Sequence, residues 1–440
     1  MSHTRTLARQ PELPAIHHDD PDTWPYLLDS TTRGGTLGRW SILLRTDPAA
    51  PSIRLDADDR TPFLPRLDRA WQRERREQPG RLPFEGGWFL YLGYELAGEI
   101  EPRLNLSPAP VDLPVALARR CDGALLVDHE TETAYAVAET AELAGQIAHQ
   151  AERSRPEPQG RAAGRFPRMI ADDGERFMRG VERIREYILA GDVFQVNLSR
   201  AWQGLGGDLP PAAAIHRNLA ARNPAPFAGL AWFPGGTLLS SSPERLVAVH
   251  DDLIEARPIA GTRPRGNSPE HDRALSDELL AHPKERAEHI MLIDLERNDL
   301  GRICAAGTVE VDELMAVESY AHVHHIVSNV RGRMVPGTSP ADVIRAVFPG
   351  GTITGCPKVR CMEIISELEG SGRGFYTGSM GYLGLDGRMD LNILIRSMLV
   401  TAGGIRFRTG AGIVADSSPE AELAETEAKA RGMMRALEDA

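Results

Sequence analysis

The spacing of apolar and polar residues changes along the chain, and the change separates two kinds of predicted structure. Up to about residue 152, short apolar runs are bounded by Gly, Pro and Asp, which is the pattern of strands. The clearest runs cover residues 40–44, 87–92 and 124–127. From about residue 168 onward, apolar residues recur at helical spacing in long segments. These predicted helices cover residues 174–190, 272–295, 341–348, 358–368 and 418–437.

Strand-like runs alternate with these helices and predict a mixed second half. They cover residues 192–201, 236–242, 378–385 and 392–400. The two halves together predict an α+β fold. Residues 1–20 are polar and predict a flexible tail, and residues 153–167 are rich in Arg, Pro and Gly, as linkers are. The sequence therefore predicts a β-rich region over 21–152 and a mixed region over 168–440.

The composition is typical of a globular protein. The 440 residues are 42% hydrophobic and 25% charged, which suffices for one large unit or two ordinary domains. No run of eighteen apolar residues appears, and the first residues lack the apolar stretch of a signal peptide. We therefore expect a soluble cytoplasmic protein. The four cysteines form no CxxC pair, so we expect them to be reduced.

The charge pattern limits the class of partner. A net charge of −12 argues against nucleic acid, because phosphate binding requires a basic surface. An anionic ligand would have to bind where basic side chains provide local positive charge. Lysine occurs only at Lys284, Lys358 and Lys429, whereas 47 of the 50 basic residues are arginine. All three lysines fall inside or beside the motifs described next, which favours a role in a site.

Two ExxE motifs are the clearest candidates for chemistry. Glu285 and Glu288 lie in one predicted helix, and Glu422 and Glu425 lie in another. Residues three apart share a helix face, although a solvated helix carries the same spacing by chance. If the two helices meet, four carboxylates converge. Such an oxygen-rich cluster suits a hard cation such as Mg²⁺.

Glycine-bearing turns are the second feature. The segment FPGGTITGCPK places a Gly-Gly-Thr turn before a helix that begins near Pro357, and exposed N–H groups at such a start bind carboxylates. Residues 258–262 and 409–417 contain further turns of this kind. Taken singly, each of these glycines is more simply explained as a bend in the chain.

Three isolated candidates complete the set. Arg396 ends the strand-like NILIR, and Lys429 follows Glu425 by one helical turn. His322, His324 and His325 form a cluster in which two rings share a strand face and the third points away, which argues against zinc. His325 is either a buried core histidine or an acid near a departing hydroxyl.

Several blocks in one order resemble the signature blocks of chorismate-utilising enzymes. They are PIAGTRPRG, AEHIMLIDLERNDLGR, HHIVSNV, FPGGTITGCPKVRCMEII, YTGSMGYLGLDGRMD and GAGIVADS. The resemblance runs from about residue 172 to the C-terminus, with a weaker likeness in the first half. It implies an anthranilate synthase component I-like α+β fold, in which two antiparallel sheets pack as a sandwich with helices outside. Region 168–440 would then be the chorismate-binding catalytic region, and Mg²⁺ the cofactor.

The resemblance also implies roles for individual residues. Glu288 and Glu425 match the Mg²⁺ ligands, with Glu285 and Glu422 as their companions. The binders of the enolpyruvyl carboxylate are matched by Tyr376, Arg396 and the backbone of Gly410, Ala411 and Gly412. The remainder of the substrate pocket is matched by Gly261, Thr262, His325, Thr352 and Lys429. Glu244 matches a glutamate near the reacting ring that moves protons.

The residue type at the position of Gln195 distinguishes members of this family. Isochorismate and salicylate synthases place a water-activating lysine where this chain has Gln195, so ammonia is the expected nucleophile. Further residues resemble aminodeoxychorismate synthase component I more than anthranilate synthase component I, namely Asn197, His324, His325, Gly351 and Ile353. We therefore expect amination of chorismate to 4-amino-4-deoxychorismate, a step towards p-aminobenzoate and folate.

Ala260 departs from that pattern. The well-known bacterial aminodeoxychorismate synthases carry a nucleophilic lysine at this place, whereas anthranilate synthases carry alanine. Either the chain forms the 4-amino product without the lysine, or it is an anthranilate synthase, or it serves both pathways. A non-catalytic binding protein of the same fold would show a broken site, whereas the matched residues here are intact.

Partners follow from the same resemblance. The chain has no glutaminase motif, so a separate glutamine amidotransferase subunit is expected to supply ammonia. The family can also carry a tryptophan pocket in its first half, and the matching residues are Leu28, Asp29, Ser30, Pro226 and Phe227. The alternative is that Leu27, Leu28 and Phe227 simply belong to the core.

Overall fold

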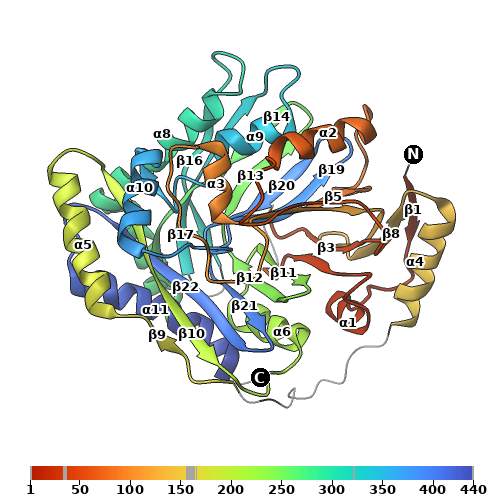
Figure 1. The fold of residues 1–440 in the computed structure, drawn as a ribbon, viewed down its shortest axis with the longest axis horizontal. Coiled ribbons are helices and arrows are strands. Elements are labelled where there is room, and N and C mark those ends of the chain that lie inside the picture. The colour runs from red at the N-terminus through yellow and green to blue at the C-terminus, as the bar shows by residue number, and fades with distance from the viewer. Residues whose placement is uncertain (1, 33–36, 155–163, 165, 321–322, 439–440) are drawn as a thin grey trace.

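The computed structural model describes residues 2–32, 37–154, 164, 166–320 and 323–438. Its strands form two antiparallel sheets (Figure 1). In the first sheet β9 (Ile170–Ala171) pairs with β10. The order of the other strands is β1 (His3–Thr6), β8 (Thr133–Ala138), β7 (Gly123–Asp128), β3 (Trp40–Arg45), β2 (Tyr26–Asp29), β11 (Phe227–Phe233), β12 (Gly236–Ser242), β21 (Ser397–Thr401), β22 (Gly404–Ile413), β10 (Gln195–Leu205) and β18 (Gly355–Cys356).

The second sheet likewise mixes strands from both halves of the chain. In it β16 (Glu310–Ser319) pairs with β17. The other strands follow the order β15 (Ile259–Pro264), β17 (Val323–Arg333), β14 (Leu253–Ala256), β13 (Arg245–His250), β20 (Met389–Asn392), β19 (Ser379–Gly384), β5 (Gly87–Leu92), β6 (Ala116–Cys121) and β4 (Ser52–Leu55). Because each sheet joins a block of early strands to a block of late strands, residues 21–152 and 168–440 share one core and are not independent domains.

The two sheets pack face to face, as expected. The ring of Tyr26 on β2 stacks on that of Phe89 on β5, with centroids 3.7 Å apart. Around this pair, Ile42 and Leu126 of the first sheet join Leu117 and Met380 of the second sheet in one buried cluster. The large aromatic area removed from water in this layer is a major source of stability.

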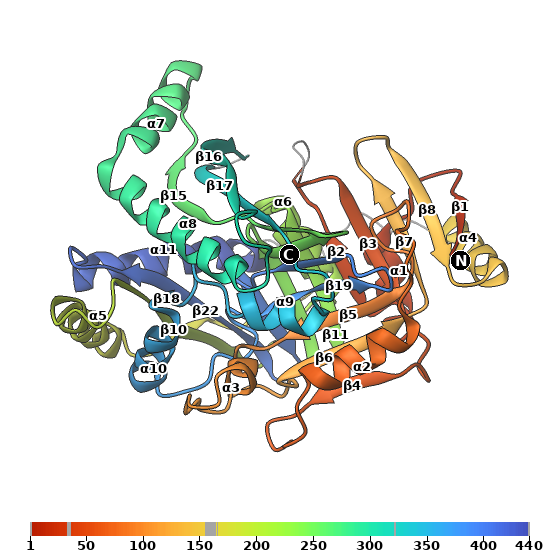
Figure 2. The same cartoon turned by 90° about the horizontal axis from the view of Figure 1, so that it is seen from above.

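Helices cover the outer faces. Their bounds are α1 (Leu13–Asp19), α2 (Leu64–Glu74), α3 (Ala97–Ile100), α4 (Ala141–Arg153), α5 (Gly174–Leu189), α6 (Ala212–Arg222), α7 (Pro269–Ala281), α8 (Pro283–Gly301), α9 (Pro340–Val347), α10 (Lys358–Glu369) and α11 (Pro419–Glu438). Helices α1, α4, α6 and α11 bury their apolar sides against the first sheet, and α2 and α9 do so against the second. Figure 2 shows α7 and α8 projecting with β15 and β16 from one side of the molecule.

Local chemistry explains where several helices begin and end. Ser268 caps α7 by accepting a hydrogen bond from the N–H of His271, and Ser339 forms a capping box with Asp342 at the start of α9. The prediction of a single helix over 272–295 is wrong. Helix α7 ends at Ala281, and a second helix, α8, begins at Pro283. A proline lacks the N–H that a continuous helix needs, but it fits the first turn of a new one.

Two further predictions differ from the structure. Residues 3–6 form β1 on the edge of the first sheet, and α1 buries Leu13 and Ile16, so the described part of segment 1–20 is not a flexible tail. The strand predicted over 392–400 is interrupted, because β20 ends at Asn392 and β21 begins at Ser397. Most of the linker predicted over 153–167 lies outside the described residues. Among the helices that the structure describes, none is both long and apolar enough to cross a membrane.

Candidate active site

Glu244 lies in the short connection between β12 and β13 and is buried, with 5% of its surface exposed. Its carbonyl oxygen accepts a hydrogen bond of 3.0 Å from the N–H of Ile393, which fixes it beside the segment that carries Arg396. Burial raises the pKa of Glu244 to about 7. The Thr352 hydroxyl, a backbone N–H and the charge of Arg396 act in the opposite direction and limit this rise. A carboxyl group with such a pKa can both give and take a proton near neutral pH.

Thr352 and Arg396 are the side chains next to this carboxyl group. Arg396 has φ of 50°, a left-handed conformation that costs a residue with a side chain roughly 1–2 kcal/mol. Burial lowers the pKa of Arg396, and the charge of Glu244 opposes that effect. Thr352 Oγ is buried and makes no hydrogen bond of ordinary geometry, although it lies close enough to stabilise the Glu244 carboxylate. The site therefore pairs an acid with a cation suited to an anionic ligand.

His325 of β17 lies opposite Thr262 of β15 and is 2% exposed. Burial, aided by the positive charge of Arg396, lowers the pKa of His325 to about 4. The ring is therefore neutral at neutral pH. Its Nδ1 lies 3.3 Å from the carbonyl oxygen of Gly261, which can only accept, so Nδ1 carries the proton. The structure thus places His325 in a buried position, and its role as an acid near a departing hydroxyl stays a prediction.

The bulge in β15 brings Gly261 against the first turn of α8. Gly261 has φ of +62°, and a Cβ atom there would lie 2.9 Å from Oε2 of Glu285. Arg263 Nη1 approaches the other carboxylate oxygen of Glu285 at 3.3 Å. Gly261, His325 and Glu285 are thus brought together. The backbone of Thr262 belongs to the same ladder, but its side chain lies outside the described part of the chain, as does His322.

A second group of predicted residues surrounds the glycines of β22. In the ladder with β10, Gly412 lies opposite Asn197, Ala411 opposite Leu198 and Gly410 opposite Ser199. A Cβ atom on Gly412 would lie 2.3 Å from Nε2 of Gln195, and one on Gly410 would lie 2.6 Å from Oη of Tyr376. The two glycines therefore leave the room that Gln195 and Tyr376 occupy. Ala411 points to the opposite face and is fully buried.

Lys429 completes this second group. Its Nζ donates a hydrogen bond of 2.9 Å to the carbonyl oxygen of Gly410 and pairs with Glu425 at 2.7 Å. The contact joins the middle of α11 to β22. Glu425 is thereby neutralised in part by Lys429.

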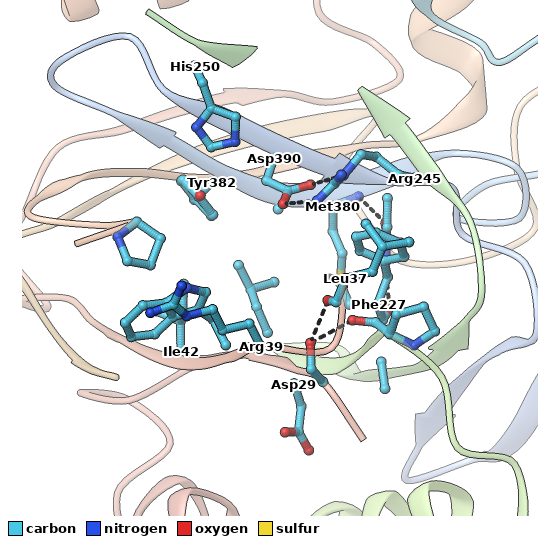
Figure 3. A pocket seen from close by; sticks show the side chains of 18 residues that line it. Asp29, Leu37, Arg39, Ile42, Phe227, Arg245, His250, Met380, Tyr382 and Asp390 are labelled. Carbon is cyan, nitrogen blue, oxygen red and sulfur yellow. Dashed lines mark hydrogen bonds and ion pairs between the residues drawn. The ribbon is translucent and has the colours of Figure 1, made fainter. Parts of the chain in front are cut away.

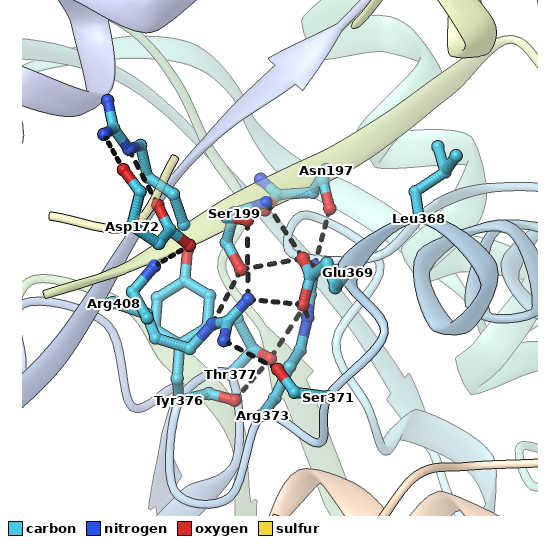
Figure 4. A network of polar contacts seen from close by, with 12 residues as sticks. Asp172, Asn197, Ser199, Leu368, Glu369, Ser371, Arg373, Tyr376, Thr377 and Arg408 are labelled. Carbon is cyan, nitrogen blue, oxygen red and sulfur yellow. Dashed lines mark hydrogen bonds and ion pairs between the residues drawn. The ribbon is translucent and has the colours of Figure 1, made fainter. Parts of the chain in front are cut away.

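A buried ionic network joins the two groups (Figure 4). Glu369 accepts hydrogen bonds from Arg373 and Arg408, and each of these three side chains is at most 9% exposed. Arg373 also donates to the carbonyl oxygens of Ile353, at 3.1 Å, and Asn197, at 2.7 Å. The guanidinium of Arg373 therefore ties the loop that carries Thr352 to strand β10, which carries Gln195. The sequence did not predict this network, because Glu369 and Arg373, four residues apart, are completed by Arg408 from the distant strand β22.

The four carboxylates predicted to bind a metal do not form one group here. Glu285 and Glu288 lie on α8, and Glu422 and Glu425 lie on α11; all four are half-buried or exposed. Among the described residues, no three His, Cys, Asp or Glu side chains are close enough to hold a metal ion together. Their oxygen chemistry suits Mg²⁺, but this arrangement does not assemble the site.

The candidate tryptophan pocket is present as a cavity of about 240 Å³ between the sheets (Figure 3). All five predicted residues line it, together with Arg245, Tyr382 and Asp390 among others. Figure 3 shows the carboxylate of Asp29 pointing away from the centre, where it is held by His216 at 3.0 Å and Ser41 at 2.6 Å. Leu28 and Phe227 are therefore wall residues of a cavity and not only core.

Comparison with known proteins places the chain in one family. The family model described as chorismate binding enzyme matches residues 27–435. The chain is 43% identical to an anthranilate synthase component I-like protein of Synechocystis sp., over 82% of this chain and 74% of that protein. It is 44% identical to aminodeoxychorismate synthase component 1 of Bacillus subtilis, over 81% of this chain and 77% of that protein.

A solved structure shares the fold. Anthranilate synthase component I from Streptococcus pneumoniae superimposes with a TM-score of 0.80 at 30% identity, covering 90% of this chain and 92% of that one. The fold is therefore anthranilate synthase component I-like, as predicted. The chain belongs to the chorismate-binding enzyme family. It is a chorismate-utilising enzyme whose relatives include proteins named anthranilate synthase and aminodeoxychorismate synthase.

Proposed function

We propose that the protein is the aminating component of an aminodeoxychorismate synthase, which converts chorismate and ammonia into 4-amino-4-deoxychorismate and water. The product leads to p-aminobenzoate and folate. The observation that carries the proposal is the side chain of Gln195, which lies against Gly412, two residues along β22 from the Gly410 that Tyr376 and Lys429 approach. At the matching place, the water-activating members of the family carry a lysine.

The choice of nucleophile follows from the chemistry of that side chain. An amide has no basic nitrogen, so Gln195 cannot take a proton from water as an amine does. Ammonia needs no such base, because it carries its own lone pair. The polar face of Gln195 instead suits a role in holding ammonia or the ring near Gly412. This supports amination over hydration of chorismate.

Ala260 leads us to a direct route, without a covalent lysine adduct. Ala260 pairs with Ile326 on β17 and offers no nucleophile. Both described lysine side chains are engaged, since Lys358 pairs with Asp299 and Lys429 with Glu425. On the direct route, ammonia adds to the ring as the hydroxyl departs. Glu244 supplies the proton that turns the departing hydroxyl into water.

The cofactor we propose is Mg²⁺, held by Glu288 and Glu425 with Glu285 and Glu422 behind them. When bound, it would neutralise the carboxylates of chorismate in a protein of net charge −12. Binding requires α8 and α11 to approach one another.

A glutamine amidotransferase subunit is the proposed source of ammonia, because this chain carries no glutaminase motif. Free ammonia at high pH should replace that subunit in a test tube. We also propose that tryptophan occupies the cavity lined by Ser30 and Arg245. Its role there is either structural or regulatory.

Alanine at position 260 favours one alternative, anthranilate synthase component I. The test is to identify the product from chorismate, Mg²⁺ and ammonium chloride by mass spectrometry and NMR, without any added lyase. Accumulation of 4-amino-4-deoxychorismate is expected. Anthranilate in its place would overturn the proposal and assign the enzyme to the tryptophan pathway. Formation of both products would indicate a subunit that serves both pathways.

A further inference from the structure

Two buried amide oxygens on strand β10 have no hydrogen-bond donor. They are Oε1 of Gln195 and Oδ1 of Asn197, both shielded from solvent, and no described group donates a hydrogen bond to either atom. The side chain of Gln195 as a whole is also buried. A buried acceptor without a donor is costly, so such atoms ordinarily have a partner. Two of them in one short stretch of strand therefore indicate a ligand that donates hydrogen bonds.

Both amides lie on one face of β10, because residues two apart in a strand point the same way. On β22 the residues beside them are glycines. A Cβ atom on Gly412 would lie 2.3 Å from Nε2 of Gln195, and one on Gly410 would lie 2.8 Å from Oδ1 of Asn197. The hydroxyl oxygen of Tyr376 lies 2.6 Å from that same position on Gly410. Asn197 therefore borders the part of the site to which the family resemblance assigns chorismate.

The cations nearby do not supply the missing donors. Arg373 makes five hydrogen bonds, which use all the N–H groups of its guanidinium. They go to Glu369, to the hydroxyl of Thr377 and to the main-chain carbonyls of Ile353 and Asn197. Lys429 donates to the carbonyl oxygen of Gly410 instead. The side-chain oxygens of Gln195 and Asn197 therefore stay available to a ligand.

The chemistry of these two atoms selects the kind of ligand. An amide oxygen accepts hydrogen bonds and repels the oxygens of a carboxylate, so the pair disfavours the carboxylates of chorismate. Ammonia has three N–H donors and one lone pair. An ammonia molecule that donates to both Gln195 and Asn197 keeps its lone pair free for the ring. Its nitrogen gains positive charge as the C–N bond forms, and two acceptor dipoles already in place stabilise that charge.

We propose that Asn197 is a substrate-binding residue that holds ammonia through Oδ1, with Oε1 of Gln195 as the second acceptor. The proposal rests on the proposed function, which names ammonia as the nucleophile, and it adds the atoms that orient it. The nitrogen bonds to the ring while the C–O bond of the hydroxyl breaks. The hydroxyl leaves as water with a proton from Glu244. The new C–NH3⁺ group releases one proton to solvent, from which Glu244 regains one, so protons and charge balance.

The variant Asn197→Leu tests the assignment, because leucine has a similar size to asparagine and no acceptor. With chorismate, Mg²⁺ and ammonium chloride at fixed pH, we expect KM for ammonia to rise about tenfold to a hundredfold, while KM for chorismate stays within about twofold. The control is Asn105→Leu, at an exposed asparagine in the loop after α3, which should leave both constants unchanged. An unchanged KM for ammonia in Asn197→Leu, or a rise in KM for chorismate alone, would overturn the proposal.

A second variant separates ammonia binding from mere support of the fold. Asn197→Asp keeps an oxygen acceptor and adds a negative charge. We expect KM for ammonia to stay within about threefold of the parent, whereas KM for chorismate rises because the carboxylate repels an anionic substrate. A purely structural residue would move both constants together in both variants. A KM for ammonia as high in Asn197→Asp as in Asn197→Leu would show that the oxygen does not bind ammonia.

Rubidium gives a readout that does not depend on turnover, because Rb⁺ resembles ammonium in radius and binds amide oxygens. In crystals soaked in rubidium chloride, we expect an anomalous peak between Gln195 and Asn197 in the parent and none in Asn197→Leu. Absence of that peak in the parent contradicts the proposal. If the peak is present but ammonium chloride yields no aminated product, the proposed function fails while the pair of acceptors stands. Anthranilate as the sole product would likewise overturn the proposed function and leave the ammonia site intact.

Discussion

Glu244 and Arg245 are consecutive in the chain, yet they face different sites. The carboxyl group of Glu244 lies by Thr352 and Arg396, whereas the guanidinium of Arg245 lines the tryptophan-pocket cavity and pairs with Asp390 at 2.9 Å. Neighbouring side chains on an extended chain point to opposite faces, which explains the arrangement. The two sites therefore share one stretch of backbone between β12 and β13.

The first prediction concerns that cavity. Ser30 Oγ donates to the carbonyl oxygen of Pro226 at 2.8 Å and forms part of the wall. In Ser30→Leu, the larger side chain fills the space and leaves that carbonyl unpaired. We expect L-tryptophan to bind the parent and to bind the variant at least about tenfold more weakly, a loss of roughly 1.4 kcal/mol, by isothermal titration calorimetry. The exposed Ser52→Leu on β4 serves as the control, and equal affinity in all three proteins would place tryptophan elsewhere.

The second prediction concerns the metal. Chelation of Mg²⁺ should stop the consumption of chorismate, and added Mg²⁺ should restore it, because the carboxylates of enzyme and substrate would otherwise repel one another. Glu288→Ala should abolish consumption at all Mg²⁺ concentrations that support the parent. Glu310→Ala, at an exposed glutamate on β16, should behave as the parent does. Consumption by Glu288→Ala at the parent rate would show that the metal assignment is wrong.

The third prediction concerns the glycines of β22. In Gly412→Ala the new methyl group would lie 2.3 Å from Nε2 of Gln195, so that side chain has to move. We expect kcat/KM with ammonia to fall about tenfold to a hundredfold, since overpacking typically costs 1–3 kcal/mol. Gly403→Ala is the control, because its Cβ would meet only Thr401 Oγ at 3.6 Å. Steady-state kinetics decides, and matching values for both variants would argue against a role of Gln195.

The fourth prediction concerns stability. Burial alone would raise the pKa of Glu369, but Arg373 and Arg408 outweigh it and lower the pKa. A carboxylate whose pKa is lowered by folding stabilises the fold fully at pH values above its unfolded pKa of about 4.5. That contribution is lost as the pH falls below 4.5 and through the lower pKa of the folded state. Glu369→Gln leaves two buried cations unpaired and should cost about 3–5 kcal/mol at pH 7.

Urea unfolding at several pH values checks this. The parent should lose stability more steeply than Glu369→Gln as the pH falls below about 4.5, because only the parent has the Glu369 carboxylate to protonate. Glu367→Gln, an exposed glutamate on the same helix, should unfold like the parent. A loss below 1 kcal/mol in Glu369→Gln would mean that the network contributes little.

Periodicity and motif order sufficed to predict much of the fold. The predicted helices over 174–190 and 358–368 nearly match α5 and α10, and the strands over 87–92 and 236–242 match β5 and β12. Helices α5 and α10 bury one face, and strands β5 and β12 are buried along nearly their whole length; a helical spacing and a continuous apolar run indicate these two cases in the sequence. Segment 1–20 was misread because β1 is an edge strand without an apolar face, and its order comes from pairing with β8.

The candidate site was only partly predictable. The resemblance grouped Tyr376 with Gly410 and Gly412, and in the structure Tyr376 does lie against Gly410, whereas the position of Gln195 against Gly412 was not predicted. The sequence did not indicate that Glu296 of α8, which is 6% exposed, is buried, because a charged residue in a helix ordinarily faces solvent. The separation of the carboxylates on α8 and α11 depends on how two distant helices are placed, which no local pattern encodes.

The strand order has a consequence for how the protein is made. Strand β5 has β6 on one side from early on, but its other neighbour is β19, which begins at Ser379. Strand β2 likewise pairs with β11, which is made later because it begins at Phe227. A growing chain therefore exposes unpaired apolar edges until nearly nine-tenths of it has left the ribosome. Long-range closure of this kind is slow, and the nascent chain is a natural client for chaperones that shield sheet edges.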